Sequence, residues 1–113
     1  MARLERYSFG RLLIDGREHR RDVIVLPDRV VADWWRGEGH SLHIEDLGEV
    51  LDELPARLIV GCGADGRLQP DPAAVEALRK RGVEVELMRT ADAVRRYCEL
   101  DERSTAAALH LTC

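Results

Sequence analysis

The apolar residues in the first third of the chain follow the patterns of β-strands. Leu12 and Ile14 lead into Asp15-Gly16, a dipeptide that favours a two-residue hairpin turn because both positions tolerate positive φ. The run from Val23 to Leu26 is continuously apolar, which predicts a strand covered on both faces. Val30-Val31 predicts one more short strand. This part of the chain is therefore expected to be β-structure that begins with a hairpin.

After Gly39 the spacing of apolar residues becomes helical. One stripe predicts a helix that ends at Pro55, and it consists of Ile44, Leu47, Leu51 and Leu54. The five acidic residues between these positions resemble a metal cluster only superficially, and we interpret them as the solvent-exposed face of the helix.

Two further helices alternate with strands in the second half of the chain. Asp71-Pro72 supplies an N-cap acceptor and a proline for the first helical position, and Gly82 is expected to end that helix. Thr90 is expected to cap the next helix, whose apolar face is expected to bury Cys98. The predicted strands lie at 58–60, 83–87 and 106–111. Such alternation predicts an α/β domain with helices on the faces of a parallel or mixed sheet.

Size and composition restrict the protein to a few classes. With 113 residues, 45% hydrophobic and 34% charged, the chain 1–113 is expected to form a single globular domain. The net charge of −4 offers no basic field for nucleic acid. No apolar run approaches the ~20 residues that span a bilayer. Three cysteines at unrelated spacings argue against a secreted disulfide scaffold, so we expect a cytoplasmic protein that does not bind membranes.

The most plausible place for a small ligand is the loop that follows the predicted strand at 58–60. Its glycines, Gly61, Gly63 and Gly66, have the spacing of a dinucleotide-binding loop. That function is disfavoured because Arg67–Pro70 separates the glycines from the next helix, whose cap, Asp71, is negatively charged. The loop could still form an anion-binding nest from its N–H groups. Glycines that merely allow a tight exit from the strand are the simpler interpretation.

Three reactive side chains belong to the same hypothesis. Cys62, His110 and Cys113 would form an activated thiolate if the fold brought a cysteine and the histidine together. We predict no metal site, because His110 and Cys113 fall short of the four ligands of structural zinc, and no cofactor.

Trp34 and Trp35 are the two tryptophans of the chain. Adjacent residues rarely share a face, so one is expected to cover the core while the other points elsewhere. An exposed tryptophan is a good anchor for a protein partner, and both are candidate interface residues. Burial of both by a bend in the chain is an equal alternative.

Several segments together resemble the MTH nine-three-eight-like domains, a family of small α/β proteins. They are Tyr7-Ser8-Phe9-Gly10, Ile14-Asp15-Gly16, Trp34-Trp35, Gly61-x-Gly63 before Pro70, Gly82, Thr90, Ala93-Val94, Tyr97 and His110-x-Thr112-Cys113. Relatives in that family include the mitochondrial complex I assembly factor three and an adipogenesis-associated protein. The resemblance implies a three-layer α/β fold with a mixed central sheet, helices on its faces and an N-terminal β-hairpin layer. It implies no catalytic residues.

We therefore expect a non-enzymatic binding or assembly module with a protein partner. The alternative is a small-molecule-binding protein or small enzyme that uses the Gly61–Gly66 loop with Cys62, His110 and Cys113. A third possibility is a subunit that acts only as an oligomer.

Overall fold

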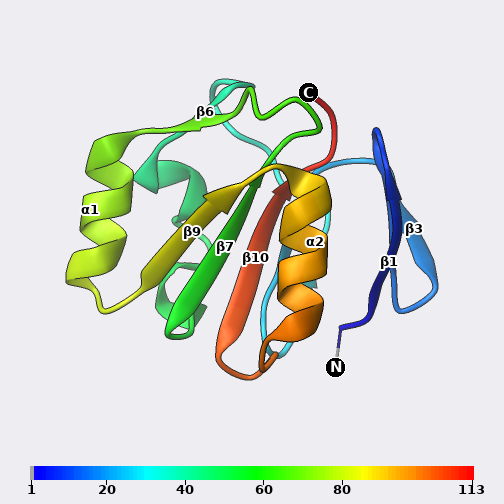
Figure 1. The fold of residues 1–113 in the computed structure, drawn as a ribbon. Coiled ribbons are helices and arrows are strands. Elements are labelled where there is room, and N and C mark those ends of the chain that lie inside the picture. Colours follow the sequence, from blue (N-terminus) through cyan, green and yellow to red (C-terminus); the bar gives the residue numbers. More distant parts are fainter. Residues whose placement is uncertain (1) are drawn as a thin grey trace.

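A mixed five-stranded sheet forms the centre of the computed structural model, which describes residues 2–113 (Figure 1). The strand order is β5-β4-β10-β7-β9. The last three strands are mutually parallel, and β4 runs antiparallel to both β5 and β10. In chain order the strands are β4 (Val23–Val25), β5 (Val30–Val31), β7 (Arg57–Cys62), β9 (Glu84–Met88) and β10 (Thr105–His110). The predicted α/β fold with a mixed central sheet is confirmed.

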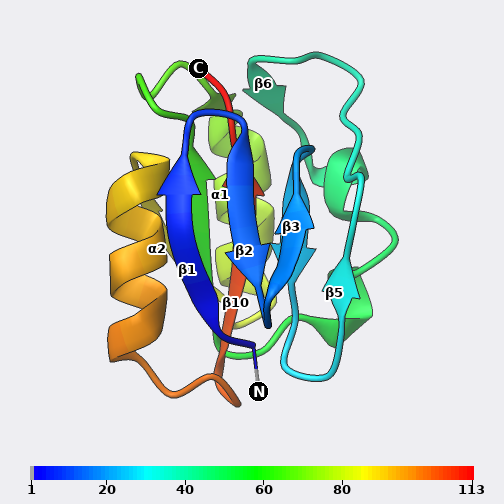
Figure 2. The ribbon, with the colours of Figure 1, turned by 90° about the vertical axis from the view of Figure 1, so that its right-hand side faces the viewer.

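Helices and a second sheet cover the two faces of this central sheet. Helix α1 (Pro72–Lys80) packs on one face. Helix α2 (Thr90–Glu99) and a three-stranded antiparallel sheet lie side by side on the other (Figure 2). The small sheet consists of β1 (Leu4–Ser8), β2 (Arg11–Ile14) and β3 (Arg17–His19). The three-layer arrangement implied by the family resemblance is confirmed.

Strand β7 shows how the sequence builds a core on both faces of the sheet. Leu58 and Val60 point toward α1, whereas Ile59 points toward α2 and the small sheet, and all three are fully buried. Successive side chains of a strand alternate between faces, so a continuously apolar run satisfies both layers at once. No helix within residues 2–113 has both the length and the apolar character that crossing a membrane requires.

Local signals predict the hairpin and α1 correctly. Asp15 and Gly16 have φ values of 51° and 80° and join β2 to β3. The Asp71 carboxylate accepts a hydrogen bond from the N–H of Ala73 (3.0 Å), and Gly82, at φ 86°, follows the end of α1. These conformations depend on neighbouring residues alone, which is why the sequence reveals them.

The helix predicted over 44–54 is wrong. The segment forms two 3₁₀ helices, η1 (Ile44–Leu47) and η2 (Leu51–Glu53). Its backbone hydrogen bonds join residues three apart, as from the Gly48 N–H to the Glu45 carbonyl (3.1 Å) and from the Val50 N–H to the Leu47 carbonyl (3.0 Å). Leu47 and Val50, three residues apart, are both buried, so the apolar spacing follows the tighter 3₁₀ period.

Two expectations for α2 are also wrong. Arg89 occupies the N-cap position and Thr90 is the first helical residue. Cys98 is exposed, because the buried face of the helix consists of Thr90, Ala93, Val94 and Tyr97. Packing against the sheet decides which residues of the helix are buried, and Cys98 lies just outside that face.

A parallel pair of short strands borders the site described next. β6 (Ser41–Leu42) pairs with β8 (Gln69–Pro70). The Gln69 N–H donates to the His40 carbonyl (2.9 Å), which joins the glycine-rich segment after Trp35 to the chain beyond the Gly61–Gly66 loop.

Candidate functional site

The Gly61–Gly66 loop lies at the carboxyl end of β7, where ligands commonly bind in open α/β sheets. Most N–H groups in and just after the loop, however, already donate within the protein. The pairs are Gly63 to Thr90 Oγ1 (2.8 Å), Ala64 to the Thr112 carbonyl (2.6 Å), Gly66 to the Gly63 carbonyl (3.2 Å), Arg67 to the Cys113 carbonyl (3.0 Å) and Leu68 to the Cys62 carbonyl (3.0 Å). An anion nest needs converging N–H groups that remain free, and these ones are engaged.

Gly63 is the point of closest packing in this loop. Its φ is 100°, a conformation that residues with a side chain rarely adopt. A Cβ added there would lie 2.5 Å from the carbonyl carbon and oxygen of Cys113 and 2.9 Å from His110 Cδ2. The main chain of 112–113 therefore covers the β10 side of the loop and leaves no room there for a ligand.

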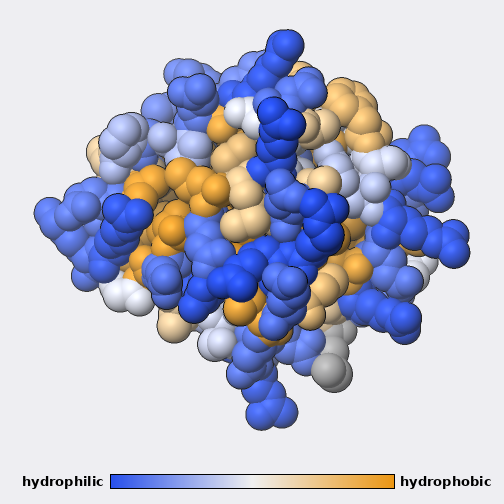
Figure 3. Space-filling model, viewed as in Figure 1, coloured by the Kyte–Doolittle hydropathy of each residue, from blue (hydrophilic) through white to orange (hydrophobic). Residues whose placement is uncertain are grey.

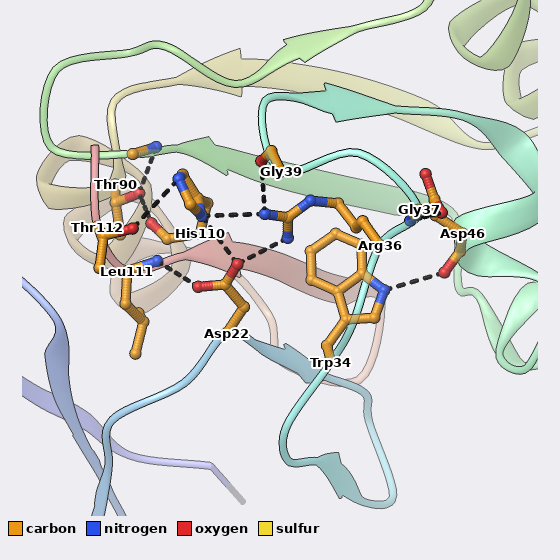
Figure 4. Close-up of polar contacts among 11 residues, drawn as sticks. Asp22, Trp34, Arg36, Gly37, Gly39, Asp46, Thr90, His110, Leu111 and Thr112 are labelled. Atoms are coloured by element: carbon orange, nitrogen blue, oxygen red, sulfur yellow. Dashed lines mark hydrogen bonds and ion pairs between the residues drawn. The ribbon is translucent and has the colours of Figure 1, made fainter.

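His110 belongs to a buried polar cluster with Asp22 and Arg36 (Figure 4). Asp22 directly precedes β4 and His110 ends β10, and the antiparallel pairing of these strands places the two side by side. His110 Nδ1 lies 2.8 Å from Asp22 Oδ2, and Arg36 Nη1 lies 2.7 Å from the same oxygen. The Leu111 N–H donates to the other carboxylate oxygen (2.8 Å).

The contacts around Asp22 keep it ionised. Burial by itself raises the pKa of this carboxyl group. The hydrogen bonds from His110, the Leu111 N–H and Arg36 together outweigh burial and hold the pKa of Asp22 below its ordinary value. The cluster is thus a buried ion pair with a histidine against it.

Arg36 fastens the glycine-rich segment after the tryptophans to the sheet. It is 7% exposed, and its Nη2 donates to the Gly39 carbonyl (2.9 Å) and lies 3.1 Å from His110 Nδ1. Its guanidinium carbon lies 4.8 Å from the centre of the Trp34 ring, a cation–π contact. Among the contacts of residues 2–113, its Nε has no hydrogen-bond partner.

The structure brings together some of the predicted reactive residues and separates others. Cys62 is paired with His110 in the register of β7 and β10, but its Sγ lies 3.8 Å from the Val60 carbonyl oxygen. Burial raises the pKa of the Cys62 thiol, and a backbone hydrogen bond with Met88 opposes this only in part. Cys62 is therefore a buried thiol and not an activated nucleophile.

Cys113 instead lies next to a different histidine, His40. Its Sγ lies 3.5 Å from His40 Nε2. The rings of His40 and His110 stand edge to face, with 6.1 Å between their centroids. Within residues 2–113, no group of three or more histidine, cysteine, aspartate or glutamate side chains is arranged to hold a metal ion.

One arrangement in this cluster resembles the acid–base–nucleophile order of a catalytic triad. It consists of Asp22, His110 and the hydroxyl group of Thr112. The Thr112 Oγ1 to His110 Nε2 distance is 3.5 Å, at the limit of a hydrogen bond. Arg36 shares the carboxylate, and His110 is 5% exposed beneath the loop around Gly63. These contacts cross-link the start of β4, the end of β10 and the segment after Trp35.

The two tryptophans point in opposite directions, as their adjacency predicts. Trp34 is 8% exposed, and its ring N–H donates to the Asp46 carbonyl (2.9 Å). Trp35 is 79% exposed. Asp33, in the left-handed region at φ 53°, makes the turn that precedes them. Their role as a partner interface stays a prediction.

A hollow of about 540 Å³ lies beside Trp35. Its lining includes both tryptophans and the exposed acidic residues Asp33, Glu45 and Glu49. Within residues 2–113, none of these three carboxylates takes part in a salt bridge. The hollow therefore combines an exposed aromatic ring with a net negative charge.

Sequence reasoning missed Asp22 and the buried role of Arg36, and it assigned Thr90 a different role. Thr90 Oγ1 accepts from the Gly63 N–H and donates to the His110 carbonyl (2.6 Å), so its hydroxyl bridges the loop and β10. The position of Arg36 directly after two tryptophans was the one feature of the sequence that could have indicated its buried role, because tryptophan rings favour contact with guanidinium groups.

Comparison with known proteins assigns the family. Residues 4–110 match the model described as "Protein of unknown function (DUF498/DUF598)". The chain belongs to this family. Similar solved structures include the conserved hypothetical protein PH1505 from Pyrococcus horikoshii OT3, at 28% identity and a TM-score of 0.83 over 98% of this chain and 99% of that chain. Another is Rpa2829 from Rhodopseudomonas palustris, at 30% identity and a TM-score of 0.76 over 96% and 82%.

A third structure bears on the family resemblance. A protein from Bordetella pertussis, described as a Mth938-like domain, shares 22% identity and a TM-score of 0.78 over 97% of this chain and 85% of its own. At that identity the likeness concerns the fold alone. Together with the family match it confirms the resemblance to the MTH nine-three-eight-like domains. The family is described as one of unknown function, so the comparisons establish membership and no activity.

Proposed function

We propose that this protein is a non-enzymatic binding module that recognises a protein partner through Trp35 and the acidic hollow beside it. The observation that carries the proposal is the 79% exposure of Trp35 between two buried, anchored neighbours. Tryptophan is the residue type most enriched at the energetic centres of interfaces, and here it is presented to solvent. We place this role in the cytoplasm on the strength of the sequence prediction alone.

The position of Trp35 is held from both sides. The main-chain N–H of Trp34 donates to the Asp22 carbonyl (2.8 Å), and the Arg36 side chain binds the Asp22 carboxylate. The Gly37 N–H then donates to Asp46 Oδ1 (3.1 Å). A main chain fixed on both sides of Trp35 loses little conformational freedom on binding, which favours affinity. The buried cluster is thus the support of the binding surface.

The negative charge of the hollow predicts the chemistry of the partner surface. Asp33, Glu45 and Glu49 add negative charge around an aromatic ring, so the complementary surface has an arginine or lysine next to apolar groups. Electrostatic attraction of this kind weakens with added salt.

The alternative function used the Gly61–Gly66 loop with Cys62, His110 and Cys113. The engaged N–H groups of the loop, the raised pKa of the Cys62 thiol and the contact of the 112–113 main chain with Gly63 weigh against it. They favour the binding module.

Affinity capture from cell extract with matched variants tests the proposal. Proteins retained by the wild type should be lost with Trp35→Ala and with Glu45→Lys, and should be released by salt. Phe9→Ser is the control, since Phe9 is 63% exposed and does not line the hollow. Equal retention by the Trp35 variant and the wild type would show that this surface does not recognise a partner.

A direct measurement then follows with the purified partner. Trp34→Phe leaves Trp35 as the single tryptophan of the chain, and its fluorescence should shift to shorter wavelength when the ring leaves water. An unchanged spectrum at saturating partner would place the contact elsewhere.

A further inference from the structure

A second hollow, of about 320 Å³, lies at the carboxyl ends of β7 and β9. Its walls are Leu68, Pro70, Leu87 and Met88, with Cys62 6% exposed and Arg89 also in the lining. No lining residue comes from β10 or from the hollow at Trp35. The hollow is therefore separate from the closed His110 side of the loop and from the proposed partner surface.

The lining is apolar and lacks a cover within the described chain. β9 is the edge strand of the central sheet, and Leu87 is 48% exposed. Figure 3, drawn from the side of Figure 1, shows hydrophobic residues gathered between α1 and β9. Leu87 is thus a large apolar side chain left partly in water beside the hollow, and apolar hollows of this kind are typical of ligand-binding sites.

Arg89 supplies the one charged group of the lining. It forms no salt bridge within residues 2–113. Its side chain passes over Gly66, whose φ of 72° brings the loop close: a Cβ added to Gly66 would lie 3.6 Å from Arg89 Cγ. A guanidinium group without a partner, beside an apolar wall, fits an anionic group attached to an apolar chain.

We propose that this hollow binds a small apolar monocarboxylate, with its hydrocarbon chain against Pro70 and Leu87 and its carboxylate paired with Arg89. A single arginine matches a single negative charge, and its planar fork binds a carboxylate through two parallel hydrogen bonds. The volume lies at the small end of ligand pockets, which limits the chain to a short one. Gly66 and Cys62, selected from the sequence as ligand-binding candidates, line this hollow, whereas Gly63, His110 and Cys113 do not.

Octanoate is the probe, with octanol and octylamine as neutral and cationic analogues of the same chain length. The chain has two methionines, so methyl labelling places Met88 in a spectrum with one other methionine signal. Octanoate should shift the Met88 methyl resonance in a saturable manner, and the two analogues should bind at least about tenfold more weakly.

Matched variants locate the charge recognition. Arg89→Gln should weaken octanoate binding by about tenfold or more, whereas Arg67→Gln, an exposed arginine outside the lining, should leave it unchanged. Leu87→Asp, at an exposed position that tolerates the change, should abolish it.

Three results would overturn the proposal: no saturable shift of Met88, octanol binding as tightly as octanoate, or Arg89→Gln binding as tightly as the wild type. Trp35→Ala should not alter octanoate binding, so a failure here is distinguishable from a failure of the proposed partner surface.

Discussion

Replacing Gly63 with alanine tests whether the strand end next to His110 is closed. Two costs add at this position. An L-residue at φ 100° costs about 1–2 kcal/mol relative to glycine. Forcing a methyl group to 2.5 Å from the main chain of Cys113 adds an overpacking cost of about 1–3 kcal/mol, because the N–H groups of Ala64 and Arg67 hold the main chain of 112–113 in place.

The sum is a loss of about 2–5 kcal/mol in the free energy of unfolding. A chain of 113 residues has an unfolding entropy near 0.24 kcal/mol/K, so each kcal/mol lowers Tm by about 4 °C. Gly63→Ala should therefore lower Tm by about 8–20 °C. Thermal unfolding followed by circular dichroism, or by calorimetry, measures this directly.

Two other glycines separate the two costs. Gly82 has φ 86° and nothing within 4 Å of an added Cβ, so Gly82→Ala should show the backbone cost alone, about 4–8 °C. At Gly61 an added Cβ would lie 2.9 Å from Leu109 Cδ2 and from Thr90 Oγ1, without a positive φ, so Gly61→Ala shows the packing cost alone. If Gly63→Ala is no less stable than Gly82→Ala, the main chain of 112–113 does not close the site, and the reasoning against a ligand there fails.

Three further predictions concern titration and reactivity. Asp22, its pKa held low, stabilises the fold above the ordinary carboxyl pKa of about 4 and loses this contribution as pH falls through its lowered value. Asp22→Asn should lose about 3–5 kcal/mol at neutral pH and lack this acid dependence in urea unfolding; an unchanged pH profile would contradict the ion pair. Burial raises the pKa of Tyr97 to about 12, so stability that is complete below about pH 10 should fall as pH rises toward 12. Tyr97→Phe should remove that alkaline loss, and ultraviolet titration of tyrosinate checks the pKa itself. Alkylation followed by mass spectrometry should modify exposed Cys98 well before buried Cys62, although burial raises the thiol pKa of both; equal rates would contradict the burial of Cys62.

The elements predicted correctly are those whose causes lie within a few residues. The Asp15-Gly16 turn, the Asp71 cap and the buried strand at 58–60 each depend on local conformation or on an uninterrupted apolar run. The error over 44–54 arose because apolar spacings of three and four residues fit both a 3₁₀ helix and an α-helix over so short a segment.

The candidate site depended far more on long-range contacts. Asp22 and His110 are 88 residues apart in the chain, and Arg36 and His110 are 74 apart. Nothing local marks these residues as partners, since each contact follows from strand pairing and from the bend after β5. The separation of Cys62 from Cys113 has the same origin, because one side chain lies in the core and the other meets His40.

By itself the sequence determined the α/β class, the N-terminal hairpin, the caps of α1 and the loop at which a strand ends, because local preference and apolar periodicity encode them. The resemblance of several motifs indicated the family and its three layers. Tertiary structure alone decided which tryptophan faces water, which side of the Gly61–Gly66 loop is closed and which side is hollow. The physical reason is that burial and side-chain contact are properties of packed neighbours. Those neighbours come from distant parts of the chain, and only the folded arrangement of the sheet brings them together.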